Sequence, residues 1–582
     1  MSVHIYHIDN ESFFMTIPYL WISLLLNAVL LWWALSNVLF SSIPVLHHSD
    51  PQHIDAASWY KAHPVDLLNA SAVFNTVHGA LKQKDSNLMP VGVSFIPAYI
   101  PPNTLMYHST SQPEIPETFE WIAMDWEFSY SFAGFQRGKK LHFGPPPKKP
   151  HASKLPGKFG KPRGDSYLYT FRNTKPLDKI IYLEGASAAK TASGEMDQQL
   201  VLSNQDSYDG IVDEYTAADV ICKWGKDFGL QGYIRLEVGF EMVLCDFHDG
   251  IELAANVSLA NVTDLAHLPN EKPEAETPLE KKREKLVDSW AHMNSWEWAS
   301  SGAHVNDGEN RILLDYSKMV TPHNKTWMDP DPYMRRLLTL SKNEKETLIS
   351  DVRKSMLEPA EPYKKTDWQL VTGRLEEKFA PLLMMLETAF RVFENELDKG
   401  DLGEPLENAV GDLSRITYNI VRRYAARDIR DDNAQREDAF KKAVEDYASH
   451  TYPLTTSVES LIYSSIYKIT HELMTHIFDI YYTSRDMFHD IYVEPSSDHH
   501  DEFKKTLLSK RKALSEFMGV LRWSIFTRCN EACAWDQICY SPTWGPGPFG
   551  WGANDKYMYH DGDRYRIPKD LSCVSWKDVS RR

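Results

Sequence analysis

The longest run of apolar side chains lies near the N-terminus. Between Ser12 and His48 the chain carries no charged side chain. About 20 apolar residues are enough for a helix to cross the hydrocarbon core of a bilayer, and this run is longer. We therefore expect a short tail at 1–16 and an uncleaved transmembrane anchor at 17–42. A cleaved signal peptide and a buried core helix are the alternatives. The first basic residue is Lys61, so a signal peptide would lack its basic region.

Charge does not orient this anchor. Neither flank carries a nearby lysine or arginine, so the positive-inside rule gives no direction. Four acceptor triplets for N-linked glycans favour a lumenal or extracellular position for the bulk of the chain. Their asparagines are Asn69, Asn256, Asn261 and Asn324. The sequence therefore predicts a single-pass membrane glycoprotein of the endoplasmic reticulum, the Golgi or the cell surface.

Short apolar runs bounded by turn residues predict a mixed α+β domain at 90–265, which follows a polar stalk at 43–89. The runs begin at Val91, Thr104, Tyr167, Lys179, Tyr233 and Phe240. A helix is expected over 214–224. A basic segment rich in proline and glycine interrupts the domain at 137–165. We interpret it as a solvated insertion, with a binding loop for an acidic partner as the alternative.

Helical periodicity dominates after a linker region at 266–328. Apolar residues then recur at three- and four-residue steps, which is typical of helices with one buried face. The stripes comprise Leu375, Phe379, Leu382, Leu386, Phe390, Phe393 and Leu397, then Leu406, Val410, Leu413, Thr417 and Ile420. Further long helices are expected over 458–483 and 503–528. These stripes predict an α-helical bundle at 329–528.

Composition limits the class of protein and its partners. The chain has 582 residues, of which 43% are apolar and 25% charged, so we expect two or three globular domains. The net charge of −17 argues against nucleic acid as a partner, because neutralising phosphates requires a basic face. The membrane, reached through the N-terminal helix, is the one partner that the sequence indicates. No protein partner is specified.

Four of the six cysteines lie in the tail at 529–582: Cys529, Cys533, Cys539 and Cys573. Because glycine and proline are frequent in this tail, it cannot readily build a core of its own, and covalent links would stabilise it. Zinc is the alternative, but the spacing C-x3-C-x5-C is not that of a paired knuckle. We predict two disulfides here. The separate Cys222 and Cys245 either pair or remain buried thiols.

The sequence predicts no metal site and no cofactor. The segment His471-Glu-Leu-Met-Thr-His476 resembles a zinc motif, but its histidines are five residues apart instead of four. On a helix this spacing turns them away from a common face. The segment 184–191 follows a predicted strand as a phosphate-binding loop would, yet Glu184 and Ala189 replace its two defining glycines.

One segment carries a resemblance to an enzyme family. Thr104-Leu-Met-Tyr-His-Ser-Thr-Ser111 resembles the first motif of ADP-ribosyltransferase-like domains, and the resemblance extends over roughly 90–250. It implies that His108 binds a ribose hydroxyl and that Tyr130 stacks on nicotinamide. It also implies that Glu237 or Glu241 polarises the transferred ribose. Ser109 departs from the family pattern, which has glycine there.

As a whole, the chain resembles a family of uncharacterised fungal single-pass membrane proteins. The segments that carry this resemblance include 113–125, 181–189, 240–247 and 533–539. We therefore expect an α+β protein with an N-terminal transmembrane helix, a helical bundle and a cysteine-stapled tail. The first functional hypothesis is a non-catalytic, membrane-anchored lumenal or cell-surface glycoprotein. The alternatives are an ADP-ribosyltransferase-like enzyme or pseudoenzyme, and an accessory protein of a fungal biosynthetic pathway.

Overall fold

The computed structural model describes most of the chain beyond residue 54. The described residues are 55–110, 114–131, 166–189, 193–207, 211–236, 239–259, 278, 308–323, 328–329, 331–397, 402–448, 454–542, 559–561 and 564–575. The predicted anchor at 17–42 and the basic insertion at 137–165 lie outside them. Within the described ranges, no helix combines the length and the apolar character that crossing a bilayer requires.

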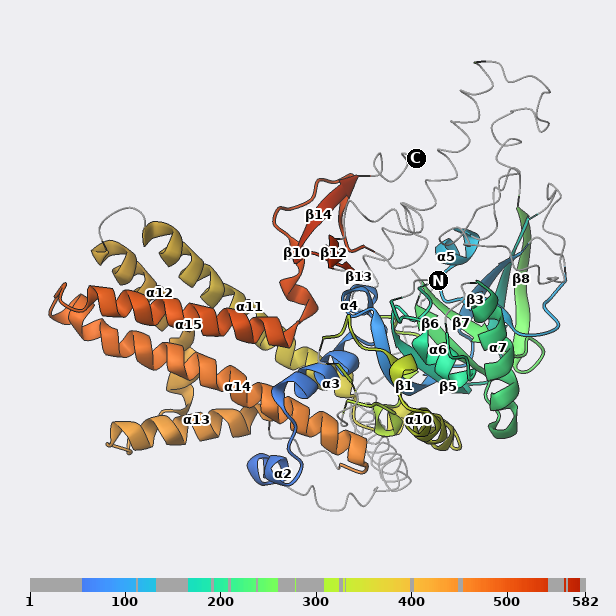
Figure 1. The fold of residues 1–582 in the computed structure, drawn as a ribbon, viewed down its shortest axis with the longest axis horizontal. Helices are drawn as coiled ribbons and strands as arrows, with labels where there is room; N and C mark the ends of the chain where they lie inside the picture. The colour runs from blue at the N-terminus through green and yellow to red at the C-terminus, as the bar shows by residue number, and fades with distance from the viewer. Residues whose placement is uncertain are drawn as a thin grey trace, which may run out of the picture. The chain divides into compact units, whose positions relative to one another are not determined.

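A mixed sheet of nine strands organises the α+β part of the protein (Figure 1). The strand order is β8-β4-β2-β3-β7-β6-β5-β1-β9, and β5 pairs with β6 in parallel, whereas the other described pairs in this sheet are antiparallel. All six predicted runs form strands of this sheet. The bounds are β1 (Val91–Ile100), β2 (Leu105–Thr110), β3 (Glu120–Ala123), β4 (Ser166–Asn173), β5 (Leu177–Gly185), β6 (Gly232–Leu236), β7 (Phe240–Leu244), β8 (Ile251–Leu259) and β9 (Leu313–Leu314).

The two faces of the sheet belong to different cores, because successive side chains of a strand point to opposite faces. Tyr233 and Val243 belong to a core shared with α6 (Asp197–Leu202), α7 (Ile211–Gly225) and α10 (Lys342–Ser355). Ile234 and Met242, one residue along each strand, belong to the larger core that continues into the helical region. Leu348 and Val352 of α10 are buried in the first of these cores. Helix α10 therefore packs with the sheet, although it lies within the range 329–528 in which the sequence predicts the bundle.

The predicted linker also contributes to the sheet. Leu313 and Leu314 of β9 pair with Tyr99 and Ala98 of β1. A further bridge joins Val320 to Phe95, with hydrogen bonds of 2.8 Å in both directions. Residues 308–323 are therefore part of the folded α+β region. A two-residue strand has no periodicity of its own, so the sequence did not reveal it.

Five helices form the predicted bundle. They are α11 (Trp368–Glu396), α12 (Gly403–Tyr424), α13 (Asp432–Ala448), α14 (Ser457–Phe488) and α15 (His500–Leu521). The predicted stripes of α11 and α12 are buried, with Phe379, Leu386, Phe390 and Leu413 fully inaccessible. The helical character of this region is therefore confirmed. Asp367 begins α11 by accepting a hydrogen bond from the Leu370 backbone N–H at 2.9 Å, which satisfies one free donor of the first turn.

Residues 55–89 are not a stalk. They form α2 (Ala56–Ala62), α3 (Leu67–Gly79) and α4 (Gln83–Leu88), and every residue of α3 from Ala70 to Gly79 is buried. Helix α3 packs against α11, α14 and α15. Its polar side chains made the segment look solvated, but they have buried partners. Ser71 and Asn75 both donate to the carbonyl of Leu521, at 3.0 and 2.8 Å.

Candidate functional site

His108 occupies a buried position on β2. It is 9% exposed, and its Nδ1 lies 2.7 Å from the backbone oxygen of Trp121 on the neighbouring strand β3. Its ring meets the edge of Phe247 in the large core. Burial lowers the pKa of His108, and the hydrogen bond to Trp121 opposes this only in part. The histidine is therefore a neutral, hydrogen-bonded core residue.

Glu241 lies on the opposite face of the sheet. Tyr107 of β2 pairs with Ala123 of β3, which pairs with Glu241 of β7. Residues paired across strands share a face, so Glu241 shares the face of Tyr107 and not that of His108. Glu237 lies outside the described residues. The sheet therefore separates His108 from the described candidate for the catalytic glutamate.

Tyr130 lies on α5 (Trp126–Ser131), which packs against β2 and β3. The Ser129 hydroxyl donates to the Ser109 hydroxyl at 3.2 Å, so α5 covers the face opposite to His108. The described geometry does not bring His108, Tyr130 and Glu241 into one cleft. An ADP-ribosyl transfer needs the ribose ligand, the stacking ring and the carboxylate around one substrate, and in the described residues His108 lies across the sheet from α5 and Glu241.

The environment of Glu241 is a buried charge cluster centred on Arg235, which is 1% exposed. The Arg235 Nε donates to Glu241 at 2.9 Å, and its Nη1 donates to Gln199 at 3.1 Å. Its second terminal nitrogen pairs with Glu214 of α7. The Tyr233 hydroxyl also donates to Gln199, at 3.1 Å. One guanidinium thus joins β6, β7, α6 and α7.

Aromatic rings cover this cluster. The guanidinium of Arg235 lies over the Trp121 ring, 5.4 Å from its centre, and Tyr215 meets the Trp121 ring edge-on at 4.7 Å. Burial raises the pKa of Glu120, and the nearby Glu241 and Glu214 raise it further, against the backbone hydrogen bond from Trp121. The cluster was missed because its five members come from four separate segments. It is suited to locking α7 onto the sheet, since each charged group already has a partner.

The first disulfide also ties α7 to the sheet. Cys222 of α7 is bonded to Cys245, directly after β7, with a Cα–Cα distance of 5.5 Å. The sequence left open whether these cysteines pair. They do, and the disulfide crosses between the same two elements that Arg235 joins through Glu214 and Glu241.

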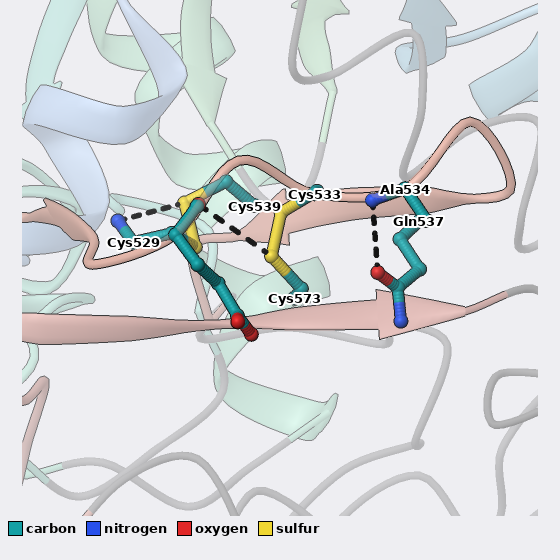
Figure 2. Close-up of a disulfide and its surroundings, with 7 residues drawn as sticks. Cys529, Cys533, Ala534, Gln537, Cys539 and Cys573 are labelled. Carbon is teal, nitrogen blue, oxygen red and sulfur yellow. Dashed lines mark hydrogen bonds between the residues drawn. A yellow bond between two sulfur atoms is a disulfide. The ribbon is translucent and has the colours of Figure 1, made fainter.

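The tail contains the two predicted disulfides (Figure 2). Cys529 is bonded to Cys539, and Cys533 to Cys573, across a small sheet of β10 (Arg528–Cys529), β11 (Gln537–Tyr540) and β14 (Asp570–Ser575). The sulfurs of Cys529, Cys533 and Cys539 lie within 4.8 Å of one another, a spacing that could suit a metal ion. All three are bonded in disulfides, so their thiolates are not available as ligands.

The tail is also attached to the main body. Arg566 donates to Asp331 at 2.8 Å, and its guanidinium lies over the ring of Tyr333. Ile567 and Leu571 pack against Ala186 and Ala189. Both alanines belong to the segment 184–191, which resembles a phosphate-binding loop in its position after a strand. That segment therefore forms a packing surface for the tail. Arg566 is the last residue of β13 (Arg564–Arg566), which pairs with β12 (Tyr559–Asp561) in antiparallel orientation.

The histidines of the zinc-like segment contact different neighbours on α14. His476 stacks on Phe517 of α15 at 4.5 Å, and burial lowers its pKa. His471 meets the ring of Phe440 edge-on at 5.2 Å. Each ring packs against a different neighbouring helix, as the five-residue spacing implies.

Two of the four glycan acceptors lie within the described residues. Asn69 is on α3, where its side-chain amide donates to Asp66 at 2.6 Å, and Ser71 of its triplet is buried. Asn256 is on β8, and both Asn256 and Ser258 of its triplet are exposed. Asn261 and Asn324 lie outside the described residues.

Comparison with known proteins identifies the relatives of this chain. The model of the YPL277C N-terminal domain matches residues 57–159, 148–277 and 273–360, and that of the YPL277C C-terminal domain matches 367–495. Uncharacterized protein YOR389W of Saccharomyces cerevisiae is 32% identical over 573 residues, covering 88% of this chain and 89% of the relative. The chain belongs to the YPL277C family. Uncharacterized protein YPL277C itself, from the same yeast, is 38% identical over 368 residues, which cover 55% of this chain and 75% of YPL277C.

The boundary between the two family models coincides with the start of α11. The two domain models meet between residues 360 and 367, immediately before α11 begins at Trp368. The N-terminal model therefore includes the sheet, α10 and the buried helix α3. No solved structure matches the chain significantly. The predicted resemblance to a fungal family is confirmed, and these comparisons add no support for the ADP-ribosyltransferase resemblance.

Proposed function

We propose that this member of the YPL277C family is a membrane-tethered protein of the secretory pathway that acts by binding. One observation carries the proposal: the three disulfides use all six cysteines of the chain. Disulfides persist in oxidising compartments and are rare where glutathione and thioredoxin keep thiols reduced. The body of the protein then faces the lumen or the cell exterior.

The proposed tether is the uncharged run at 17–42, which is long enough to span a bilayer as a helix. The body begins at α2, whose first residue is Ala56. Proposed glycans on the acceptor asparagines agree with the same orientation.

A binding role is supported by the state of the candidate catalytic groups. Glu241, one of the two candidates for the catalytic glutamate, is buried and accepts a hydrogen bond from the Arg235 Nε at 2.9 Å. His108 faces the other side of the sheet, and its Nδ1–H donates to the Trp121 carbonyl. A general acid or base must reach the proton that it transfers, and these groups are already engaged.

The deciding experiment uses the full chain in intact microsomes from a yeast that expresses it. Added protease should leave the body intact until detergent opens the vesicles. Non-reducing peptide mapping after thiol alkylation should recover the peptides joined by Cys222–Cys245, Cys529–Cys539 and Cys533–Cys573. A body that is digested in sealed vesicles, or cysteines that are all alkylated, would overturn the proposal.

A further inference from the structure

Strand β8 forms an unusually open edge of the sheet. It is the terminal strand of the sheet order, and in the described part of the chain no strand pairs with its outer side (Figure 1). Its residues from Glu252 to Ser258 are all exposed. Leu253 and Val257 are 40% and 50% exposed. Among the described residues, the outer backbone groups of this nine-residue strand therefore have no strand partner.

The protection of the β8 edge is limited to one register shift against β4, between Thr170 and Phe171, where Ala254 is the extra residue on β8. Natural edge strands usually carry lysine, proline or a bulge that discourages pairing with another chain. The sequence Ile251-Glu-Leu-Ala-Ala-Asn-Val-Ser-Leu259 contains no proline and no lysine. Its single charge, Glu252, is paired with Arg172 of β4. An exposed edge with apolar residues and low net charge is an aggregation hazard, and a covering group beyond the single register shift would reduce it.

The exposed acceptor triplet Asn256-Val-Ser258 lies on β8. Asn256 is paired in register with Tyr169 of β4, and its side chain and that of Ser258 are both exposed. The Asn69 triplet is the opposite case. Its serine donates from a buried hydroxyl to the Val520 carbonyl at 2.7 Å, and Asn69 itself is bonded to Asp66. A glycan would fit at Asn256 and would disrupt the packing of α3 at Asn69.

We propose that Asn256 carries an N-linked glycan that shields the β8 edge, and that Asn69 is left unmodified. The inference rests on the proposed function, because glycan transfer occurs in the secretory pathway. In the transfer, the Asn256 Nδ2 loses a proton and bonds to the anomeric carbon of a lipid-diphosphate-linked oligosaccharide. The bond from that carbon to phosphate breaks, and the lipid diphosphate leaves. The bulky, hydrated glycan then prevents a second strand from approaching.

The test compares sequon variants of the full chain expressed in yeast. N256Q and S258A remove the same acceptor triplet by substituting different residues of it. Each variant should therefore migrate faster on a gel than the unmutated chain, by the shift of one glycan. N69Q is the matched control and should keep the mobility of the unmutated chain. The variants N261Q and N324Q show whether the two remaining triplets carry glycans. Digestion with endoglycosidase H should bring all these chains to one mobility.

Association in detergent solution tests the shielding role. N256Q and S258A should form dimers and larger species in size-exclusion chromatography, whereas the unmutated chain stays monomeric at the same concentration. N256Q with V257K places a lysine on the exposed edge and should restore the monomer. This rescue separates edge pairing from a general folding defect.

The outcomes distinguish the inference from the function on which it rests. If Asn261 or Asn324 is modified and Asn256 is not, the inference is overturned and the lumenal orientation stands. If no triplet is modified and protease digests the body in sealed microsomes, both fail. If N256Q loses its glycan and remains monomeric, the shielding role is overturned. A glycan on Asn69 would contradict the assignment of the buried triplet.

Discussion

Arg235 and Glu241 stand opposite each other in the β6–β7 hairpin, and the Arg235 Nε lies 2.9 Å from the Glu241 carboxylate. The same arginine pairs with Glu214 of α7. Glu241, one of the two glutamates that the enzyme resemblance indicated, is thus an ion-pair partner of Arg235. Two carboxylates share one guanidinium in a site closed to solvent. The ion pairs of Arg235 therefore connect β6 to both β7 and α7.

Replacing Arg235 should strongly destabilise the protein. R235M leaves Glu214 and Glu241 buried without their cation, and uncompensated buried charges typically cost about 3–5 kcal/mol. The free energy of unfolding, measured by denaturant titration of the unmutated chain and R235M, checks this expectation. R172A removes a guanidinium that pairs with Glu252 at the exposed edge, and it should cost less than about 1 kcal/mol. An equal loss of unfolding free energy in R235M and R172A would contradict the stabilising role of the buried Arg235.

Asp125 should make stability fall as the pH rises. Burial raises its pKa to about 6 from 3.8. Between these values the unfolded chain releases the proton first, so the folded state binds more protons and loses stability with increasing pH. D125N keeps an oxygen that can accept from the Phe128 backbone N–H, which now lies 2.7 Å from Asp125. At pH 7 it should gain about 2–3 kcal/mol over the unmutated chain.

Unfolding titrations of D125N and the unmutated chain from pH 4 to pH 8 check this prediction. The difference should shrink as the pH falls through 6 and become small near 4, where Asp125 is protonated in the folded state and about half protonated in the unfolded chain. D246N is the control, because Asp246 is exposed and accepts a similar backbone hydrogen bond from His248 at 2.8 Å. It should change stability little across the range. A constant gain for D125N would refute the linkage.

Helix α3 should be essential to the helical region. Phe74 is 1% exposed and stacks on Trp523, 449 positions further along the chain, at 5.6 Å. F74A should cost about 3–5 kcal/mol through lost burial and the resulting cavity. Leu68 of the same helix is 48% exposed, so L68A should cost less than about 0.5 kcal/mol. If F74A were as mild as L68A in thermal unfolding, the segment would behave as a stalk after all.

The two tail disulfides should contribute unequally. Cys533–Cys573 closes a separation of 40 residues and Cys529–Cys539 one of 10. Loop-closure entropy assigns about 4 kcal/mol to the longer link and about 3 kcal/mol to the shorter one. Limited proteolysis should therefore cleave the tail faster in C533A with C573A than in C529A with C539A. The reverse order would show that local packing, and not loop length, stabilises the tail.

Local patterns in the sequence predicted many of the secondary elements. The run from Val91 became β1, and the stripe through Phe379 and Phe390 became the buried face of α11. Periods of two and of about 3.6 residues are set by the geometry of a strand or helix, so they can be read without knowing the fold. The density of cysteines in the tail likewise predicted its disulfides. The partners within that group, and the pairing of Cys222 with Cys245, needed the structure.

Tertiary structure alone decided which elements meet. Ser71 and Asn75 look solvated in sequence, yet they bond to Leu521, more than 400 residues away. His108 and Glu241 look like members of one site, but strand register places them on opposite faces. A shift of one residue exchanges the faces of a strand, and no local pattern reports the register between segments distant in the chain. Sequence thus determined the elements and the cysteine chemistry, whereas long-range pairing determined the cores and the place of each candidate residue.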